Sequence, residues 1–339
     1  MLHAIIMAGG VGTRLWPVST KRRPKQILPL FGSKTLLKLT YERLRRGMAA
    51  DYLWITTSKE NFSAVRHQLP HVPLSRYSIE SHRRETAPAL ALALSKLIAH
   101  DPNAAFVYVN ADNVIKDVPG FHRTLRRAEA IVRRNPERVV LVGVKPDYPE
   151  TGYGYIRIGR KIRDGNTVSA FKEKPDLATA RRFVASGAYL WNPTLIVARA
   201  AHMLHLFEQH LPGVMRHVAR GHFHRSPSID INRGILEKEK GMLVISADFD
   251  WTDVGSWRSM YEALARRPDE NVVRGRHLGI DSRGNLLFSD SKKLFATVGI
   301  QDMIIVETPE AILALPKSRA QEVKNLVNLL DTPRLRKYK

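Results

Sequence analysis

The stretch "AIIMAGGVGTRLWPVSTKRRPKQILPL", residues 4–30, decides the fold near the start of the chain. Its apolar run, residues 4–8, predicts a buried strand, which glycines follow at positions 9, 10 and 12. Glycine lets a backbone N–H group approach a phosphate closely, because no Cβ atom obstructs it. Arg14 and Lys25 add a planar fork and a point charge for the same oxygens. The stretch therefore predicts a phosphate-binding turn; the alternative is a tight strand–helix turn with surface charges.

The spacing of these glycines matches neither of two common phosphate-binding patterns. A P-loop requires G-x-x-x-x-G-K-[ST], and a dinucleotide fingerprint requires a third glycine where Leu15 stands. The loop therefore has the context of a phosphate site without the sequence of either class.

Strand and helix patterns alternate downstream of the loop. We expect strands over 3–8, 52–57, 105–110, 138–144, 189–198 and 242–247, and helices over 36–46, 88–100 and 120–134. This alternation predicts an α/β fold, a parallel sheet with helices on both faces and sites at the carboxyl ends of strands. From 271 to 316 short strand-like pieces replace it, and a helix follows over 320–330. We therefore expect an α/β domain over 1–265 and a small β-rich domain over 266–339.

The composition is that of an ordinary globular protein except for its charge. Of 339 residues, 44% are hydrophobic and none is cysteine, which excludes thiol chemistry and suits a reducing compartment, so we expect a cytoplasmic protein. We expect neither a secretory signal nor a membrane span. The net charge of +22 is spread in small groups such as Lys21-Arg22-Arg23, without any nucleic-acid-binding motif. Neither a membrane nor a nucleic acid is expected as a partner, and a homodimer is among the states that the sequence allows.

Further motifs follow the opening stretch along the chain. They read ESHRRETAPA at 80–89, GYGYI at 152–156, FKEKPD at 171–176, WN at 191–192, SID at 228–230 and WTDVGSW at 251–257. Together with GGVGTRLWPVSTKRRPKQIL at 9–28, they resemble the ordered motifs of the sugar-1-phosphate nucleotidyltransferases, specifically the mannose-1-phosphate guanylyltransferases. The resemblance implies a Rossmann-like mixed, mostly parallel sheet flanked by helices, of the nucleotide-diphospho-sugar transferase type, with a small C-terminal β-helix-like unit.

The resemblance also implies a reaction, the transfer of GMP from GTP to α-D-mannose 1-phosphate to give GDP-mannose and pyrophosphate. It implies catalytic roles for Arg14, Lys25, Asp112 and Lys174, and carboxylate ligands of Mg²⁺ at Asp112 and Asp253. Contacts to the nucleotide are implied for Gly9, Gly10, Gly12, Thr13, Glu80, Ala87 and Pro88. Contacts to the sugar phosphate are implied for Gly152, Tyr153, Glu173, Asn192 and Asp253.

The chemistry of this reaction suits such residues. The attacking phosphate oxygen is already an anion, so the main difficulty is the repulsion between two negative substrates. Two unit charges ~4 Å apart repel by about 4 kcal/mol at an effective dielectric near 20. A divalent ion with fixed lysine and arginine side chains offsets this repulsion. The Glu80 carboxylate would accept both the N1–H and the exocyclic amine of guanine, whereas adenine presents an acceptor there.

Four positions depart from the family pattern. Asn113 replaces the histidine that usually follows the metal-binding aspartate, Glu85 replaces an asparagine, and Pro193-Thr194 replaces Ser-Gly. A proline removes a backbone donor and threonine cannot mimic glycine, so the sugar-side loop is expected to differ. These departures leave two alternatives open: the same chemistry on another hexose or heptose 1-phosphate, and a catalytically weak homologue that binds nucleotide sugars.

Overall fold

The computed structural model describes residues 1–10, 12–20, 23–291 and 293–339. Of the predicted basic group Lys21-Arg22-Arg23, the first two residues lie outside the described ones. The chain divides into two compact units. We call Met1–Gly9 with Leu37–Trp251 the sheet unit, and Gly10–Leu36 with Thr252–Lys339 the loop unit. The glycine-rich loop thus forms one unit with the C-terminal residues, while the domain boundary at 265 stays a prediction.

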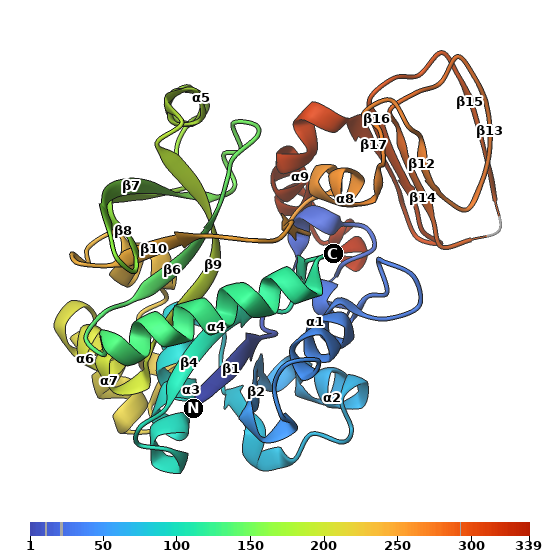
Figure 1. The fold of residues 1–339 in the computed structure, drawn as a ribbon. Coiled ribbons are helices and arrows are strands. Elements are labelled where there is room, and N and C mark those ends of the chain that lie inside the picture. Colours follow the sequence, from blue (N-terminus) through green and yellow to red (C-terminus); the bar gives the residue numbers. More distant parts are fainter. Residues whose placement is uncertain (11, 21–22, 292) are drawn as a thin grey trace. The chain divides into compact units, whose positions relative to one another are not determined.

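The sheet unit is built on one nine-stranded mixed sheet (Figure 1). Its strand order is β3-β2-β1-β4-β9-β6-β10-β8-β7. The strands are β1 (Leu2–Met7), β2 (Leu53–Ser58), β3 (Tyr77–Glu80), β4 (Ala105–Asn110), β6 (Val140–Val144), β7 (Gly154–Ile162), β8 (Gly165–Glu173), β9 (Tyr189–Arg199) and β10 (Leu243–Ser246), and a short strand outside this sheet, β5 (Asn113–Val114), follows β4. β3, β2, β1 and β4 are mutually parallel, whereas β9 runs antiparallel to β4 and β6. The predicted fold class, a mixed sheet flanked by helices, is confirmed.

Helices cover both faces of this sheet (Figure 1). They are α1 (Leu36–Arg45), α2 (Lys59–Gln68), α3 (Thr86–His100), α4 (Val118–Arg134), α5 (Leu177–Ser186), α6 (Ala200–His210) and α7 (Pro212–Ala219). α3, α6 and α7 share a hydrophobic core with alternate strand residues such as Ile5 and Phe106. α4 packs against β4, β6 and β9. It begins where the Asp117 carboxylate accepts the Gly120 N–H at 2.9 Å, an N-cap that satisfies one free donor.

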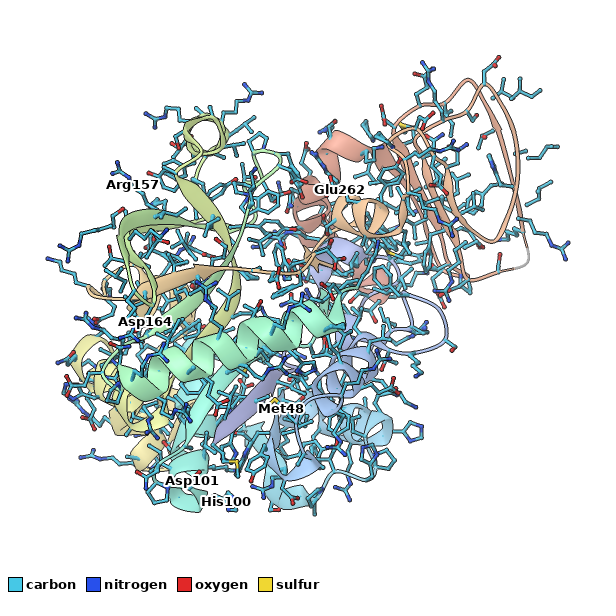
Figure 2. The ribbon with its side chains drawn as sticks, in the orientation of Figure 1. Met48, His100, Asp101, Arg157, Asp164 and Glu262 are labelled. Carbon is cyan, nitrogen blue, oxygen red and sulfur yellow. The ribbon has the colours of Figure 1, made fainter. Side chains whose placement is uncertain are left out.

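Two acidic residues, Asp101 and Asp164, lie where elements of the sheet unit end (Figure 2). Asp101, next to His100 at the end of α3, lies 3.3 Å from His3 Nε2 at the start of β1. Asp164, on the turn between β7 and β8, accepts a hydrogen bond from Arg134 at the end of α4 at 2.5 Å. The opposite, carboxyl end of β1 leads directly into the glycines.

The loop unit contains short strands, several of which stack as rungs. They are β11 (Thr252–Asp253), β12 (Val272–Arg274), β13 (Arg276–Ile280), β14 (Leu286–Ser289), β15 (Leu294–Val298), β16 (Met303–Glu307) and β17 (Ile312–Pro316), with helices α8 (Trp257–Leu264) and α9 (Val323–Leu329). β12, β14 and β16 pair in parallel, as do β13 and β15, which is the arrangement of a β-helix. The predicted helix over 320–330 begins as a 3₁₀ helix, Lys317–Glu322, and continues as α9.

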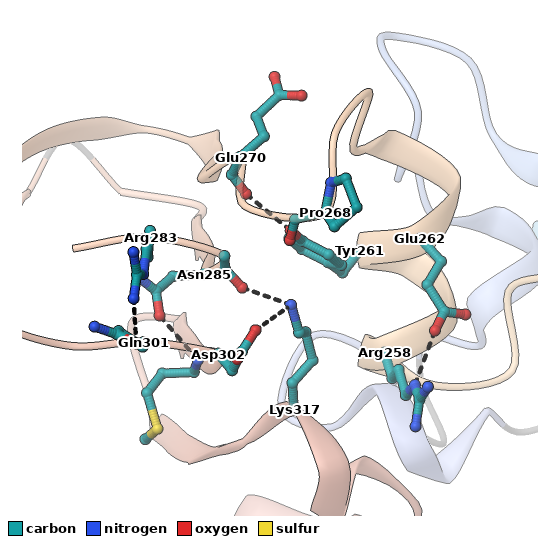
Figure 3. A network of polar contacts seen from close by, with 12 residues as sticks. Arg258, Tyr261, Glu262, Pro268, Glu270, Arg283, Asn285, Gln301, Asp302 and Lys317 are labelled. Atoms are coloured by element: carbon teal, nitrogen blue, oxygen red, sulfur yellow. Dashed lines mark hydrogen bonds and ion pairs between the residues drawn. The ribbon is translucent and has the colours of Figure 1, made fainter.

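One lysine ties α8 to the strands of the loop unit (Figure 3). Lys317 Nζ donates to Gly284 O at 2.8 Å, pairs with Asp302 Oδ1 at 2.7 Å and lies 3.7 Å from the centre of the Tyr261 ring. The Tyr261 hydroxyl in turn donates to Pro268 O at 2.6 Å. An ammonium group over an aromatic face gains electrostatic attraction in addition to its hydrogen bonds. The rungs and α8 are therefore held as one body.

The described part of the chain has no helix that is both long and apolar enough to span a bilayer.

Candidate active site

The predicted nucleotide residues of the sheet unit gather at the carboxyl ends of its parallel strands. Gly9 follows β1, Glu80 ends β3, and Asp112 lies in the turn after β4. A Cβ atom on Gly9 would lie 3.4 Å from Glu80 Oε1, so these two residues are neighbours. The chain proceeds from β1 to β2 and β3 on one side but places β4 on the other. Ligands of open α/β sheets bind at such a reversal of strand order, which here lies between Gly9 and Asp112.

The turn that carries Asp112 is held from both sides. Thr40 Oγ1 donates to Ala111 O at 3.2 Å, and the buried Arg43 donates to Asn113 O at 3.1 Å. Asn113 Nδ2 donates to Pro193 O at 3.4 Å, which joins this turn to strand β9. The prediction of a loop at Pro193-Thr194 is wrong, because both residues lie within β9 (Tyr189–Arg199). Burial lowers the pKa of Arg43 to about 10. Arg43 was not predicted from the sequence, because it does not differ in pattern from the other arginines of its helix.

Carboxylates dominate the electrostatics around Tyr108, in the strand that precedes Asp112. Burial raises the pKa of the Tyr108 hydroxyl, and the charges of Asp112, Glu80, Asp230 and Glu85 raise it further. These four carboxylates therefore act on the same point between β4 and α3. Such a negative field repels a triphosphate unless cations accompany it.

Glu80 is nearly inaccessible, with 4% of its surface exposed. Burial raises its pKa to about 7, against a small opposing effect of Arg83. Its carboxylate is therefore poised between the protonated and ionised forms near neutral pH.

Ala87 and Pro88 lie in the first turn of α3 and are buried. The Ala87 N–H donates to Ile229 O at 3.1 Å, and Thr86 Oγ1 accepts the Ile231 N–H at 2.9 Å. The SID motif thus packs on the start of α3. The structure gives Ala87 and Pro88 a packing role here, and their contact with a nucleotide stays a prediction.

The predicted sugar-side residues converge on the carboxylate of Glu173. Glu173 is 4% exposed, and its two oxygens accept from Lys174 Nζ at 2.5 Å and from Asn232 Nδ2 at 3.0 Å. Asn232 Oδ1 accepts from Asn192 Nδ2 at 3.1 Å, so Asn232 bridges two predicted residues. Asn232 was not predicted from the sequence, although it follows the SID motif by only two positions. Charge-assisted hydrogen bonds of this kind fix a buried carboxylate in one orientation.

A glycine makes room for this carboxylate. Gly154 pairs with both Glu173 and Asn192 in neighbouring strands, and a Cβ atom on it would lie 2.7 Å from Glu173 Oε2. Nearby, Gly152 N donates to Glu150 Oε1 at 2.8 Å, and the Tyr153 ring packs edge-on against two tryptophans, Trp191 and Trp251. Tyr153 O also accepts the Lys174 N–H at 3.2 Å. The structure therefore brings together five residues that the sequence assigned to the sugar phosphate: Gly152, Tyr153, Glu173, Lys174 and Asn192. Their contacts with a ligand stay predictions.

Backbone strain accompanies these residues. Three of the five non-glycine residues with positive φ in the described chain flank predicted site positions: Glu85 (64°), Lys174 (46°) and Thr194 (56°). Asn192 Oδ1 accepts the Thr194 N–H at 3.0 Å, which supports the last of them. Strained conformations of this kind cost about 1–3 kcal/mol each and cluster at functional sites.

In the loop unit, Gly12 seats the lysine of the phosphate loop. Gly12 has φ of 71°, and a Cβ atom on it would lie 2.7 Å from Lys25 Cβ and 2.8 Å from Ser19 Oγ. Gly10 lies beside the same side chain, with 3.9 Å between its would-be Cβ and Lys25 Cε. The glycines therefore let the aliphatic part of the Lys25 side chain pack against the loop. This packing is a second reason for glycine at these positions, besides the close approach of phosphate that the sequence predicts.

The remaining predicted residues of the loop unit also have defined places. Thr13 and Arg14 lie in the 3₁₀ turn Thr13–Leu15. Within the described part of the chain, the Arg14 guanidinium has no hydrogen-bond or ion-pair partner. Asp253 ends β11, and a Cβ atom on Gly255 would lie 2.5 Å from its Oδ2, so that glycine leaves space for the carboxylate.

The described residues contain no group of three or more His, Asp or Glu side chains arranged to hold a metal. A divalent cation bound by Asp112 or Asp253 would therefore complete its coordination with phosphate oxygens and water, as Mg²⁺ commonly does.

A cavity of about 400 Å³ in the sheet unit contains none of the predicted residues. It is lined by Arg46, Gly47, Val118, Pro119, His122, Arg123 and Arg126. Arg123 already pairs with Asp248 at 2.9 Å and with Asp117 at 3.8 Å, which offsets part of its positive charge.

Replacing Gly12 by alanine tests the seating of Lys25. The left-handed conformation costs an alanine about 1–2 kcal/mol, and the clash with Lys25 adds about 1–3 kcal/mol. Gly32→Ala is the matched control, because Gly32 has φ of 76° and nothing within 4 Å of its would-be Cβ. We expect urea denaturation to show a larger loss of unfolding free energy for Gly12→Ala. Equal losses in the two variants would contradict the packing role.

Replacing Glu80 by glutamine tests the buried carboxylate. Because folding raises its pKa from 4.5 to about 7, the folded protein binds more protons than the unfolded chain between these values. The Glu80 contribution to stability is therefore present below pH 4.5 and is lost as pH rises through 7, by at most about 3 kcal/mol. We expect Glu80→Gln to raise the unfolding free energy at pH 8 but not at pH 5. An equal effect at both pH values would show that burial does not shift this group.

Comparisons with known proteins agree with this geometry. The sequence profile described as "Nucleotidyl transferase" matches residues 3–270, and that of the "MannoseP isomerase/GMP-like beta-helix domain" matches 275–330. The chain is 35% identical to the alginate biosynthesis protein AlgA of Pseudomonas aeruginosa, over 96% of this chain and 72% of that protein. It is 32% identical to a mannose-1-phosphate guanylyltransferase of Escherichia coli, over 100% of this chain and 76% of that protein.

A solved structure from Thermus thermophilus, described as a mannose-1-phosphate geranyltransferase, is also similar. It is 31% identical with a TM-score of 0.88, over 98% of this chain and 99% of that one. The extent of these matches identifies the chain as a member of the nucleotidyl transferase family, an enzyme with a C-terminal β-helix domain.

Proposed function

We propose that this enzyme transfers GMP from GTP to α-D-mannose 1-phosphate, releasing pyrophosphate and forming GDP-mannose. The observation that carries the proposal is the buried Glu173 carboxylate, held by Lys174 and Asn232 beside the gap at Gly154. Relatives named mannose-1-phosphate guanylyltransferase match along the full chain and support the choice of substrates.

The sugar phosphate is proposed to bind at Glu173 and Lys174. A carboxylate offers more lone pairs than the two donors at Glu173 occupy, so it has acceptor sites left for sugar hydroxyls. Lys174, whose side chain is 40% exposed, carries a charge for the phosphate next to those acceptors. The amide of Asn192 is linked to the Glu173 carboxylate through Asn232, so it belongs to the same hydrogen-bond network. Acceptors and a cation side by side suit a molecule that carries hydroxyls and a phosphate together.

The guanine base is proposed to bind at Glu80. Its ionised carboxylate accepts the N1–H and the exocyclic amine of guanine, whereas adenine would leave the buried charge unpaired. Because the pKa of Glu80 is raised to about 7, the form that binds guanine increases as pH rises through neutrality.

Cations are required because four carboxylates already act on the crevice. Arg14 and Lys25 are proposed to neutralise the triphosphate, and Asp112 and Asp253 to hold a divalent ion, for which Mg²⁺ is the expected choice. Oxygen donors on a fixed turn fit such an ion. When bound, the ion stabilises negative charge on the phosphates.

The proposed step needs no proton transfer from the protein. An oxygen of the sugar phosphate attacks the α-phosphorus of GTP, and the bond between the α-phosphorus and the bridging oxygen breaks. The electron pair of that bond leaves with pyrophosphate. The work of Arg14, Lys25 and Lys174 is to orient the reacting anions and reduce their repulsion.

A different hexose or heptose 1-phosphate is the second candidate for the acceptor. It is favoured by strand β9, where Pro193 and the strained Thr194 replace the family's Ser-Gly. The cytoplasmic location and the homodimer stay predictions from the sequence.

Pyrophosphate release from the purified protein with Mg²⁺ tests the proposal. The assay crosses the four common nucleoside triphosphates with mannose, glucose and heptose 1-phosphates. We expect release with GTP and mannose 1-phosphate, and a fall of at least about 10²-fold in Asp112→Asn because a charged ligand becomes neutral. Asp164→Asn, on the β7–β8 turn, is the matched control and should retain activity.

Other outcomes separate the alternatives. Release with a different sugar would keep the reaction and assign the change of acceptor to Pro193 and Thr194 in β9. GTP binding without release from any pair would contradict the enzymatic proposal and favour a nucleotide-sugar-binding homologue.

A further inference from the structure

The phosphate loop is hydrogen-bonded to residues that follow it by more than two hundred positions in the same loop unit. Trp16, 7% exposed, donates its indole N–H to Tyr338 O at 2.7 Å. The carbonyl oxygen of Trp16 accepts the indole N–H of Trp257 at 2.8 Å. Trp257 is fully buried at the start of α8, with its ring centre 5.3 Å from that of Phe288. One loop residue thus bonds to both α8 and the C-terminal tail.

Further contacts hold the rest of the loop in the same way. Lys25 Nζ lies 3.5 Å from Val254 O, its hydrogen-bond acceptor. Arg274 Nη1 donates to Pro29 O at 2.7 Å. The turn Thr13–Leu15 packs against α9. The loop contains only short 3₁₀ turns in its described residues, so its shape depends on these outside contacts.

We propose that Trp16, Trp257 and the tail through Tyr338 are positioning residues, which hold Arg14 and Lys25 in the place where they meet the triphosphate. This inference rests on the proposed function, because the roles of Arg14 and Lys25 belong to it. Fixing the backbone of one residue costs about 1–2 kcal/mol of conformational entropy, which an irregular loop must recover from contacts. The β-helix unit and tail supply those contacts.

Trp16 acts most directly on the position of Arg14, which lies in the same turn. Trp16 N donates to Thr13 O at 3.3 Å, which closes the turn that contains Arg14. Since the Arg14 guanidinium has no hydrogen-bond or ion-pair partner among the described residues, its position follows the backbone of this turn. A misplacement of about 1 Å in a positioning group lowers turnover by about 10²-fold. Loss of a single hydrogen bond at Trp16 is expected to have a smaller effect, about tenfold.

The experiment uses the full chain and three changes. Trp16→Phe removes the indole donor but keeps an aromatic ring, Trp257→Phe does the same for the second indole, and a chain ending at Leu335 lacks the Tyr338 acceptor. Trp54→Phe is the matched control, because it removes a buried indole donor, bonded to His3 Nδ1 at 3.2 Å, in the sheet unit. Hydrogen exchange of a peptide covering 12–20 and steady-state kinetics are measured for each.

We expect Trp16→Phe, Trp257→Phe and the shortened chain to exchange faster over residues 12–20 and to lose about tenfold in kcat/KM for GTP. The KM for the sugar phosphate should not change. Combining Trp16→Phe with the shortened chain should lose less than the product of the single effects, because both remove one shared hydrogen bond. Trp54→Phe should change neither measurement, and thermal midpoints identify any variant that fails to fold.

Unchanged exchange and unchanged GTP kinetics in folded Trp16→Phe and Trp257→Phe would overturn the inference. An equal rise in both KM values would also overturn it, since that result indicates a general loss of structure. Absence of pyrophosphate release by the unaltered protein would contradict the proposed function alone. In that case the exchange of residues 12–20 still decides whether Trp16, Trp257 and the tail hold the loop.

Discussion

The hydrogen bonds of Trp16 are the interaction on which the phosphate loop depends. They join residue 16 to Trp257 and Tyr338, partners 241 and 322 positions away in the chain. Strand β1, which precedes the phosphate loop, lies in the sheet unit, whereas the loop belongs to the loop unit together with residues 252–339. The C-terminal residues of the loop unit therefore support the proposed reaction indirectly, because they hold the loop that carries Arg14 and Lys25. A separate contact explains why Gly12 must lack a side chain, since Lys25 packs directly against it.

Repulsion between anions explains the rest of the proposed site. In the sheet unit the charges of Asp112, Glu80, Asp230 and Glu85 act on Tyr108, and the substrates add phosphates. The carboxylates of the proposed site differ in how their negative charge is compensated. The Glu173 carboxylate accepts a hydrogen bond from the ammonium group of Lys174. Burial raises the pKa of Glu80 to about 7. Asp112 is proposed to bind a cation through its carboxylate oxygens. These environments give similar carboxylates different proposed tasks: sugar binding, base recognition and metal binding.

Sequence periodicity predicted the elements with strong patterns and missed those set by tertiary contacts. The strand over 105–110 matches β4 residue for residue, and the Ala-rich run predicts α3 within two positions of its start. Helix α2 and the hairpin of β7 and β8 were not predicted, because their exposed faces dilute the apolar pattern. Motifs predicted Glu173 and Lys174 but not Asn232 or Arg43, whose importance lies in hydrogen bonds to distant residues. Nor could periodicity show that residues 10–36 fold with the C-terminal unit, since that depends on single contacts such as Arg274 to Pro29.

The attack on the α-phosphorus is the central claim, and oxygen-isotope labelling tests it most directly. Mannose 1-phosphate carrying ¹⁸O at its three non-bridging phosphate oxygens is incubated with unlabelled GTP and the protein, and the products are analysed by mass spectrometry. The account predicts all three labels in GDP-mannose and none in pyrophosphate, because the labelled phosphate is the nucleophile. Label in pyrophosphate, or a labelled product other than the nucleotide sugar, would contradict it.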